Sequence, residues 1–248
     1  MYNPKAILLD LDDTIISFDG LTNAAWNTAC RKYVEAHNPP FDIETLRQKI
    51  REKGNWYWGD PKRHKEGRSN LPAARRRILK MVFQELEIFE EALAFELADG
   101  YSAIHDASRC LMEGAFQALE NMRSMDIRMA VITNGATEVQ REKIHRFGLE
   151  HFFEFVLIDE EVGYSKPDVR IYEIALEKLA LESKDVWMVG DNLLWDVEGA
   201  QSLGIFAVWN DYNQKGLPED AAVHPDMTVS SIYELSLEFQ KNTVKLEP

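Results

Sequence analysis

Two different rhythms of hydrophobic and polar residues divide this chain. Near the start, an unbroken apolar run at positions 6–9 ends at Asp10, which is the pattern of a short strand buried on both faces of a parallel sheet. From about position 21 to 112, apolar residues instead recur at helical spacing and strand-like runs are absent. The first rhythm predicts a sheet strand, and the second predicts an inserted segment made of helices.

After Gly114, strand-like and helical stretches alternate. This alternation is typical of parallel strands whose connecting helices cover both faces of the sheet. We therefore predict an α/β protein with a Rossmann-like parallel sheet core of residues 1–17 and 113–248, and a helical cap domain of residues 18–112 inserted after the first strand. The predicted later strands are 129–132, 153–158, 186–189, 205–208 and 227–229, and the predicted later helices are 116–125, 138–147, 168–179, 195–203 and 232–239.

Composition narrows the setting of this fold. No apolar run approaches the roughly 20 residues that cross a bilayer, and the amino-terminal stretch turns acidic at Asp10, so we expect a cytoplasmic protein with no membrane partner. The net charge of −14 argues against nucleic acid as a partner, because nucleic-acid phosphates require a basic face. Two cysteines are too few for a disulfide framework.

The acidic balance has one local exception, in the predicted helical segment. Between Arg47 and Lys80 lie twelve basic residues and three acidic ones. The simplest interpretation is a set of solvated helix faces, and the alternative is a surface that attracts an anionic substrate. Trp56 and Trp58 lie in the same stretch, where they either join a small core or stack on a flat substrate. The sequence leaves both pairs of alternatives open.

Four clusters of polar residues punctuate the strand and helix pattern. Ligands of open α/β sheets bind beyond the carboxyl ends of the strands, so polar residues placed there are candidates for a site. We expect a single site to collect the four clusters. They are the run from Asp10 to Thr14, the run from Thr133 to Gly135, Lys166 with Pro167, and Gly190-Asp191 with Asp196 five positions on.

Asp10 and Asp12 have the residue type and spacing for phosphoryl transfer. Side chains two residues apart on extended backbone point the same way, so one carboxylate can attack a substrate group while the other handles protons. An acidic run of this kind would repel a phosphate dianion unless a divalent cation neutralised it. Mg²⁺ prefers oxygen ligands, and Asp10 and Asp191 suit that role. The sequence thus predicts Mg²⁺ as a cofactor.

The remaining clusters offer partners for a phosphoryl group. Thr133 has a hydroxyl, and Asn134 and Gly135 have backbone N–H groups at a strand-to-helix turn, which is a suitable cradle for an anion. Lys166 adds a compact positive charge for the transferring group.

Taken together and in this order, the clusters resemble the four motifs of the haloacid dehalogenase-like superfamily. Those motifs are D-x-D-x-T, a hydrophobic run ending in Thr or Ser, a lysine, and Gly-Asp followed by a later Asp. The resemblance extends over about positions 6–208, and the helical insertion is similar to the cap of that superfamily. It implies a Mg²⁺-dependent phosphatase that hydrolyses a small phosphorylated metabolite through a phosphoaspartate.

The resemblance also implies a role for each matching residue. Asp10 would be the nucleophile and a metal ligand, and Asp12 would be the general acid and base and bind the metal through its backbone carbonyl. The other roles are Thr133 and Asn134 as substrate-binding residues, Lys166 as a residue that ties the nucleophile to the phosphate, and Asp191 with Asp196 as residues that bind or orient the metal. Asn192 departs from the pattern, since many members have a second consecutive aspartate there.

Other activities occur on the same motifs. A phosphomutase acting on a sugar phosphate keeps both aspartates, so it stays an alternative. A haloacid dehalogenase-type hydrolase lacks the second aspartate because halide departure needs no acid, and Asp12 counts against it. Response-regulator receivers also form a phosphoaspartate, but theirs lies later in a chain about half this length.

Overall fold

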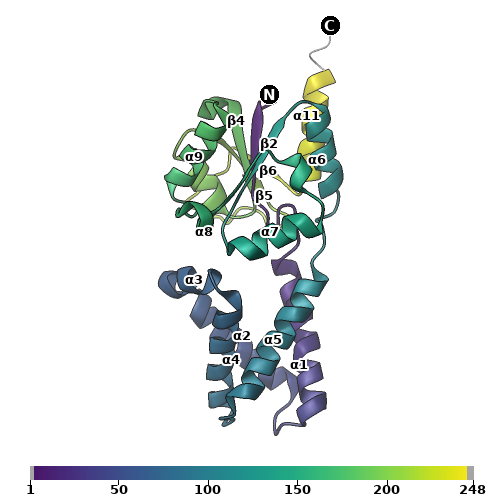
Figure 1. Ribbon diagram of the computed structural model, residues 1–248, viewed down its shortest axis with the longest axis vertical. Coiled ribbons are helices and arrows are strands. Elements are labelled where there is room, and N and C mark those ends of the chain that lie inside the picture. The colour runs from purple at the N-terminus through teal and green to yellow at the C-terminus, as the bar shows by residue number, and fades with distance from the viewer. Residues whose placement is uncertain (1–2, 245–248) are drawn as a thin grey trace. The chain divides into compact units, whose positions relative to one another are not determined.

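Residues 3–244, which the structure describes, divide into two compact units in this computed structural model (Figure 1). One unit combines the residues up to Ser17 with those from Cys110 onward, and the other is Phe18–Arg109. The first contains the sheet, and the second is built from helices. Among residues 3–244, no helix is both long enough and apolar enough to cross a membrane.

The sheet of the first unit is parallel throughout residues 3–244, which confirms the predicted fold class. Its strand order is β3-β2-β1-β4-β5-β6. Strand β1 lies inside the sheet, with β2 and β4 as its neighbours, and all of its residues are buried. This burial explains the continuous apolar run in the sequence. The strands are β1 (Ala6–Leu9), β2 (Arg128–Thr133), β3 (Val156–Ile158), β4 (Val186–Gly190), β5 (Phe206–Asn210) and β6 (Met227–Val229).

Helices cover both faces of the sheet because alternate residues of β1 enter two separate cores. Ile7 and Leu9 pack with α6, α7 and α11, whereas Ala6 and Leu8 pack with α9 and α10. Figure 1 shows α9 on one side of the strands and α6 with α11 on the other. The helices are α6 (Ala115–Ser124), α7 (Thr137–Arg146), α8 (Asp159–Val162), α9 (Val169–Leu179), α10 (Gly199–Gln201) and α11 (Ile232–Val244), with shorter turns η2 (Glu150–Phe152), η3 (Ser183–Asp185) and η4 (Leu193–Glu198).

The structure departs from the predicted elements in several places, and the last helix, α11, continues to Val244, five residues beyond its predicted end. Strand β3 starts three residues later than predicted, because the turn η2 and its connection occupy the preceding positions. Helix α8 was not predicted, since it is a single acidic turn without a hydrophobic period. The predicted helix 195–203 is instead a π-helical turn, η4, continued by α10.

The second unit is a bundle of helices around its own hydrophobic core. Polar side chains begin several of these helices: Asp42, Asp60 and Asn70 each accept a hydrogen bond from a backbone N–H in the following first turn. The helices are η1 (Asp19–Leu21), α1 (Thr22–His37), α2 (Ile43–Trp58), α3 (Pro61–Arg68), α4 (Leu71–Glu85) and α5 (Glu91–Ser108).

The second crossing of the chain between the units lies at Arg109, three residues before the end of the predicted cap segment at 112. Residues 110–112 pair with the segment that follows the first strand: Ser17 N–H donates to the Cys110 carbonyl at 2.9 Å, and Met112 N–H donates to the Ile15 carbonyl at 2.8 Å. These backbone hydrogen bonds attach 110–112 to the sheet unit. The helical period of the sequence does not reveal them, because they join segments far apart along the chain.

Candidate active site

The motif residues gather at the carboxyl edge of the parallel sheet. Asp10 directly follows β1, Thr133 is the last residue of β2, and Asp191 directly follows β4. These strands are neighbours, with β1 between β2 and β4. The fold therefore brings Asp10 together with residues more than 100 positions further along the chain, as the rule for ligand sites in open α/β sheets predicts.

Lys166 is the cationic centre of the cluster. Its Nζ lies 2.5 Å from Asp10 Oδ1 and 2.6 Å from Asp196 Oδ1. Its side chain is only 2% exposed, and both aspartates are buried. Burial by itself lowers the pKa of the ammonium group, but the charges of Asp10 and Asp196 outweigh this effect and raise the pKa of Lys166 above its ordinary value. These contacts favour the charged form of Lys166, which touches the predicted nucleophile.

Asn134 holds the backbone of Lys166 in place. The side-chain Nδ2 of Asn134 donates to the Lys166 carbonyl at 3.0 Å, and the Lys166 N–H donates to Asn134 Oδ1 at 2.9 Å. The amide of Asn134 is therefore engaged in positioning the lysine. Any contact of Asn134 with substrate would come from its backbone, and that predicted role stays a prediction.

Asp10, Asp191 and Asp196 form a site suited to a hard cation. Each offers a carboxylate oxygen, and these oxygens lie within 4.8 Å of one another. Burial raises the pKa of Asp10 to about 7 even though Lys166 opposes the shift. Burial, followed by the charges of Asp10 and Asp196, raises the pKa of Asp191 to about 9. The raised pKa values mean that too little positive charge surrounds the carboxylates of Asp10 and Asp191 to favour their anionic forms. A divalent cation bound by these oxygens would provide it.

The segment after β4 is shaped around Asp196. A Cβ placed on Gly190 would lie 2.2 Å from Asp196 Cγ, so only glycine leaves room for that carboxylate. Asp196 Oδ2 also accepts a hydrogen bond from the Asn192 N–H at 2.9 Å. The side chain of Asn192 in turn accepts from the N–H groups of Leu194 and Trp195, and it caps η4. Asn192 therefore helps to build the loop that holds Asp196.

Asp12 lies beside this cluster, and its side chain pairs with Lys143. Both of its carboxylate oxygens accept hydrogen bonds from Lys143 Nζ, at 2.6 and 2.7 Å. Gln140 Nε2 donates to Asp12 Oδ2 at 3.2 Å and to Thr133 Oγ1 at 2.5 Å. The proposed metal contact of Asp12 concerns its backbone carbonyl, and nothing in the arrangement of the side chain bears on that prediction.

The predicted anion cradle needs one correction. The N–H of Gly135 already donates to Asp159 Oδ1 at 2.7 Å. Asp159 is the first residue of α8, the helix that the hydrophobic pattern did not predict. The N–H of Gly135 therefore holds the loop. Within this motif, the Thr133 hydroxyl is linked to Asp12, because Gln140 Nε2 donates hydrogen bonds to both side chains.

Sequence reasoning missed Gln140 and Lys143. Both lie on α7, and both are buried together with Ile144 on one face of that helix. Their spacing places them on the face that should be apolar in a helix packed against a sheet. A glutamine and a lysine at buried-face positions were the available signal, since buried lysines are rare unless they are paired.

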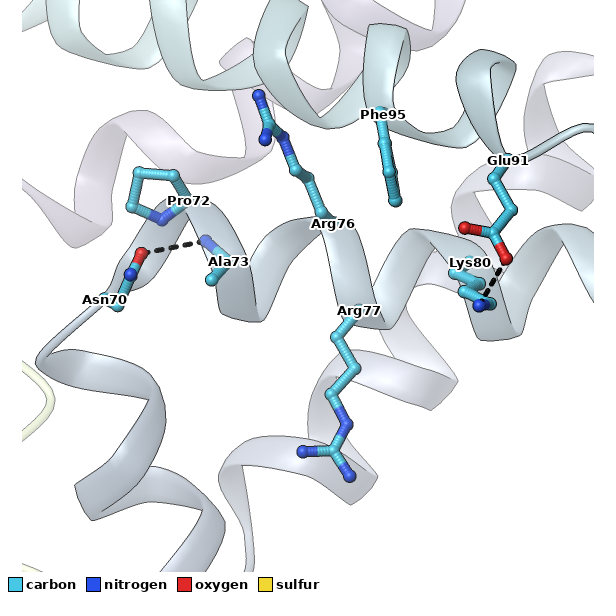
Figure 2. A pocket seen from close by; sticks show the side chains of 8 residues that line it. All are labelled: Asn70, Pro72, Ala73, Arg76, Arg77, Lys80, Glu91 and Phe95. Carbon is cyan, nitrogen blue, oxygen red and sulfur yellow. Dashed lines mark hydrogen bonds and ion pairs between the residues drawn. The ribbon is translucent and has the colours of Figure 1, made fainter.

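The helical unit has a surface hollow of its own, of about 460 Å³. Figure 2 shows the ion pair between Lys80 and Glu91 at one end of it and Arg76 and Arg77 leaving α4 in different directions. Arg76 also forms two hydrogen bonds with Asp99, at 2.8 and 2.6 Å, so part of the basic stretch is neutralised locally. The hollow is lined by Asn70, Pro72, Ala73, Arg76, Arg77, Lys80, Glu91 and Phe95.

The two tryptophans of the basic stretch have different surroundings. Trp58 packs against the core of the helical unit, as the small-core interpretation expects. Trp56 is 51% exposed, and the guanidinium of Arg63 lies 3.9 Å from its ring centroid.

The sequence matches a family model described as haloacid dehalogenase-like hydrolase over residues 4–204. A glyceraldehyde 3-phosphate phosphatase of Methanothermobacter thermautotrophicus is 32% identical over 210 residues, which cover 82% of this chain and 84% of that protein. A phosphoserine phosphatase of Thermus thermophilus is 42% identical over 120 residues, but that match spans only 48% of this chain and 47% of the relative.

Solved structures share the fold. The HAD-hydrolase YfnB of Bacillus subtilis, solved with magnesium bound, superposes with a TM-score of 0.70 at 21% identity, over 96% of this chain and 98% of that one. A 2-haloacid dehalogenase of Pseudomonas syringae gives a TM-score of 0.61 at 24% identity, over 97% and 99% of the two chains. At these identities the likeness concerns the fold alone.

Proposed function

Because the chain belongs to the haloacid dehalogenase-like hydrolase family, we propose that it is a Mg²⁺-dependent phosphatase that hydrolyses a small phosphomonoester through a phosphoaspartate on Asp10. The observation that supports this most strongly is the pairing at the sheet edge: Asp10 is in contact with a buried Lys166, and Asp12 stands two residues on with its own buried lysine. The phosphatases among the relatives support the same reaction class.

In the first half of the proposed reaction, Asp10 attacks the phosphorus of the bound ester. Lys166 contacts Oδ1 of Asp10, so Oδ2 is the oxygen free to form the new O–P bond. The bond from phosphorus to the leaving oxygen breaks, and Asp12, which enters this step in its protonated form, donates that proton to the leaving oxygen. Thr133 and Lys166 stabilise the charge on the transferring phosphoryl group.

In the second half, the phosphoaspartate is hydrolysed. Asp12, now deprotonated, takes a proton from a water molecule that attacks the phosphorus. The O–P bond to Asp10 breaks, inorganic phosphate leaves, and both aspartates return to their starting states. One acid-base residue thus serves both halves of the cycle.

The Mg²⁺ of this proposal would be held by the carboxylates of Asp10, Asp191 and Asp196 and by the backbone carbonyl of Asp12. The fit rests on the oxygen-only donor set and on the raised pKa values of Asp10 and Asp191. When bound, the cation supplies positive charge that offsets repulsion between the carboxylates and the phosphate.

The helical unit is proposed as the cap domain of the enzyme, in which the substrate-selecting side chains lie. The names of the relatives suggest two classes of candidate substrate, three-carbon sugar phosphates and phosphorylated amino acids. Matches to pyrimidine 5′-nucleotidases add nucleoside monophosphates as a third class. A cytoplasmic location and the lack of a nucleic-acid partner stay predictions from the sequence.

The test is phosphate release from glyceraldehyde 3-phosphate, phosphoserine, pyrimidine nucleoside monophosphates and p-nitrophenyl phosphate, with Mg²⁺ and with EDTA. We expect release that requires Mg²⁺ and that is abolished by Asp10→Asn. Asp185→Asn is the matched control, because it removes only a surface ion pair with Lys5. Transfer of phosphate to a second position on a sugar, in place of release, would establish the phosphomutase alternative, and no turnover of any ester would contradict the proposal.

A further inference from the structure

We propose that Lys143 and Gln140 are positioning residues that fix the carboxylate of Asp12 for proton transfer to the leaving group. This inference rests on the proposed function, in which Asp12 is the general acid and base. The two side chains come from one face of α7 and reach Asp12, the third residue after the end of β1. No motif of the sequence analysis includes either residue.

Lys143 holds both oxygens of Asp12 at once. Its Nζ lies 2.6 Å from Oδ1 and 2.7 Å from Oδ2, so the ammonium group restricts rotation of the carboxylate. The Lys143 side chain is 2% exposed, whereas the Asp12 side chain is 26% exposed. The lysine is thus the fixed, enclosed member of the pair, and Asp12 keeps an accessible edge.

Gln140 links this pair to the phosphoryl-binding motif. Its Oε1 accepts from Lys143 Nζ at 2.6 Å, and its Nε2 donates to Asp12 Oδ2 at 3.2 Å and to Thr133 Oγ1 at 2.5 Å. The amide of Gln140 therefore sets the position of Asp12, the proposed acid, relative to the Thr133 hydroxyl that would hold the phosphoryl group. A change in Gln140 would shift the two relative to each other.

Stability alone does not account for a buried lysine here. Desolvating an ammonium group costs free energy that its ion pair commonly fails to offset, and apolar side chains of similar size serve a core at least as well. The same helix offers a comparison: Arg141 forms two hydrogen bonds with Glu161 at 2.8 and 2.7 Å, but its side chain is 52% exposed. Arg141 is an ordinary surface pair, whereas Lys143 is buried against the proposed acid.

A positioning role predicts a dependence on the leaving group. An alkoxide leaves only with a proton from Asp12, whereas p-nitrophenolate leaves without one. Misplacing Asp12 should therefore slow the phosphorylation of Asp10 by alkyl phosphates far more than by p-nitrophenyl phosphate. The value of kcat/KM reports this first half of the reaction, because phosphorylation is the step at which the leaving group departs.

The experiment compares Lys143→Met with the unaltered protein and with Arg141→Met. The substrates are p-nitrophenyl phosphate and the alkyl phosphate that the unaltered protein hydrolyses fastest. For Lys143→Met we expect kcat/KM to fall about 10- to 100-fold with the alkyl phosphate and about threefold or less with p-nitrophenyl phosphate. We also expect a burst of p-nitrophenolate in the first turnover, because hydrolysis of the phosphoaspartate still needs Asp12 as base. Arg141→Met should leave kcat/KM unchanged for both substrates.

Equal falls of kcat/KM for both substrates would show that Lys143 is merely structural and would overturn the proposal, and so would no change for either. If Lys143→Met does not fold, Gln140→Ala tests the same claim, since it removes the hydrogen bonds of Gln140 with Asp12, Thr133 and Lys143 but keeps the charge of the lysine and its two contacts with Asp12. Its smaller perturbation should give the same preference for p-nitrophenyl phosphate. Failure of the proposed function is recognised separately, because the unaltered protein would then hydrolyse none of the esters.

Discussion

Replacing Lys166 with methionine should destabilise the sheet unit strongly, because it removes the cation from a buried acidic cluster. The lysine contacts Asp10 and Asp196 at 2.5 and 2.6 Å, and methionine preserves most of its volume. Removing one partner of a buried ion pair costs about 3–5 kcal/mol, since the charges left behind are uncompensated. We expect a loss of this size in the free energy of unfolding at pH 8 in EDTA.

The loss should depend on pH in a specific direction. The pKa of Asp10 is already about 7 in the presence of the lysine, and removing the positive charge raises it further. At pH 5 the folded variant therefore carries a neutral Asp10, and repulsion from Asp196 is relieved. We expect the destabilisation at pH 5 to be about half of that at pH 8 or less.

Urea unfolding, followed by two spectroscopic probes to check for a single transition, measures this prediction. A double-mutant cycle with Asp10→Asn separates the ion pair from the packing of the lysine stem. In the Asp10→Asn background, Lys166→Met should cost clearly less than in the unaltered protein. A loss below about 1 kcal/mol at pH 8, or a loss of the same size in both backgrounds, would refute the reasoning, because the predicted loss comes mainly from buried, uncompensated charge.

Three further predictions concern the metal cluster, its loop and the helical unit. In EDTA, the Tm should fall as pH rises from about 6 to 9. The folded pKa values of Asp10 and Asp191, about 7 and 9, exceed the ordinary 3.8, so the folded protein binds protons that the unfolded chain has already released, and it loses them in this pH range. Differential scanning fluorimetry should show that Mg²⁺ reverses the fall. Gly190→Ala should lower stability by about 1–3 kcal/mol and weaken Mg²⁺ binding measured by titration calorimetry, since its methyl group overlaps Asp196. Asn70→Ala should cost about 1 kcal/mol in urea unfolding and leave phosphate release unchanged, because it removes only the cap of α4.

The sheet and the edge at which the motif residues meet could be predicted from the sequence. Strand β1 is buried on both faces, so its run is uniformly apolar, and Asp10 marks the point at which burial ends. The alternation of strands and helices after Gly114 then implies parallel neighbours whose carboxyl ends lie together. Local pattern was sufficient for Asp10, Thr133 and Asp191, because each lies at the end of the strand that positions it or directly after it.

The partners of the motif residues could not be predicted in the same way. Lys143 and Gln140 sit in a helix whose period indicates which face is buried, but a period does not identify what lies opposite that face. The contact between Gly135 and Asp159 joins a loop to a four-residue helix too short to show a period at all. Such contacts depend on the three-dimensional approach of separate segments, and they decide which backbone N–H groups remain for a ligand.

The most direct test of the account is rapid-quench mass spectrometry of the protein mixed with p-nitrophenyl phosphate and Mg²⁺. The account predicts a phosphoryl adduct on the peptide that contains Asp10, formed before phosphate release reaches its steady rate, removed by hydroxylamine and absent from Asp10→Asn. Steady phosphate release without any adduct, or an adduct that persists in Asp10→Asn, would contradict the proposal that Asp10 is the nucleophile.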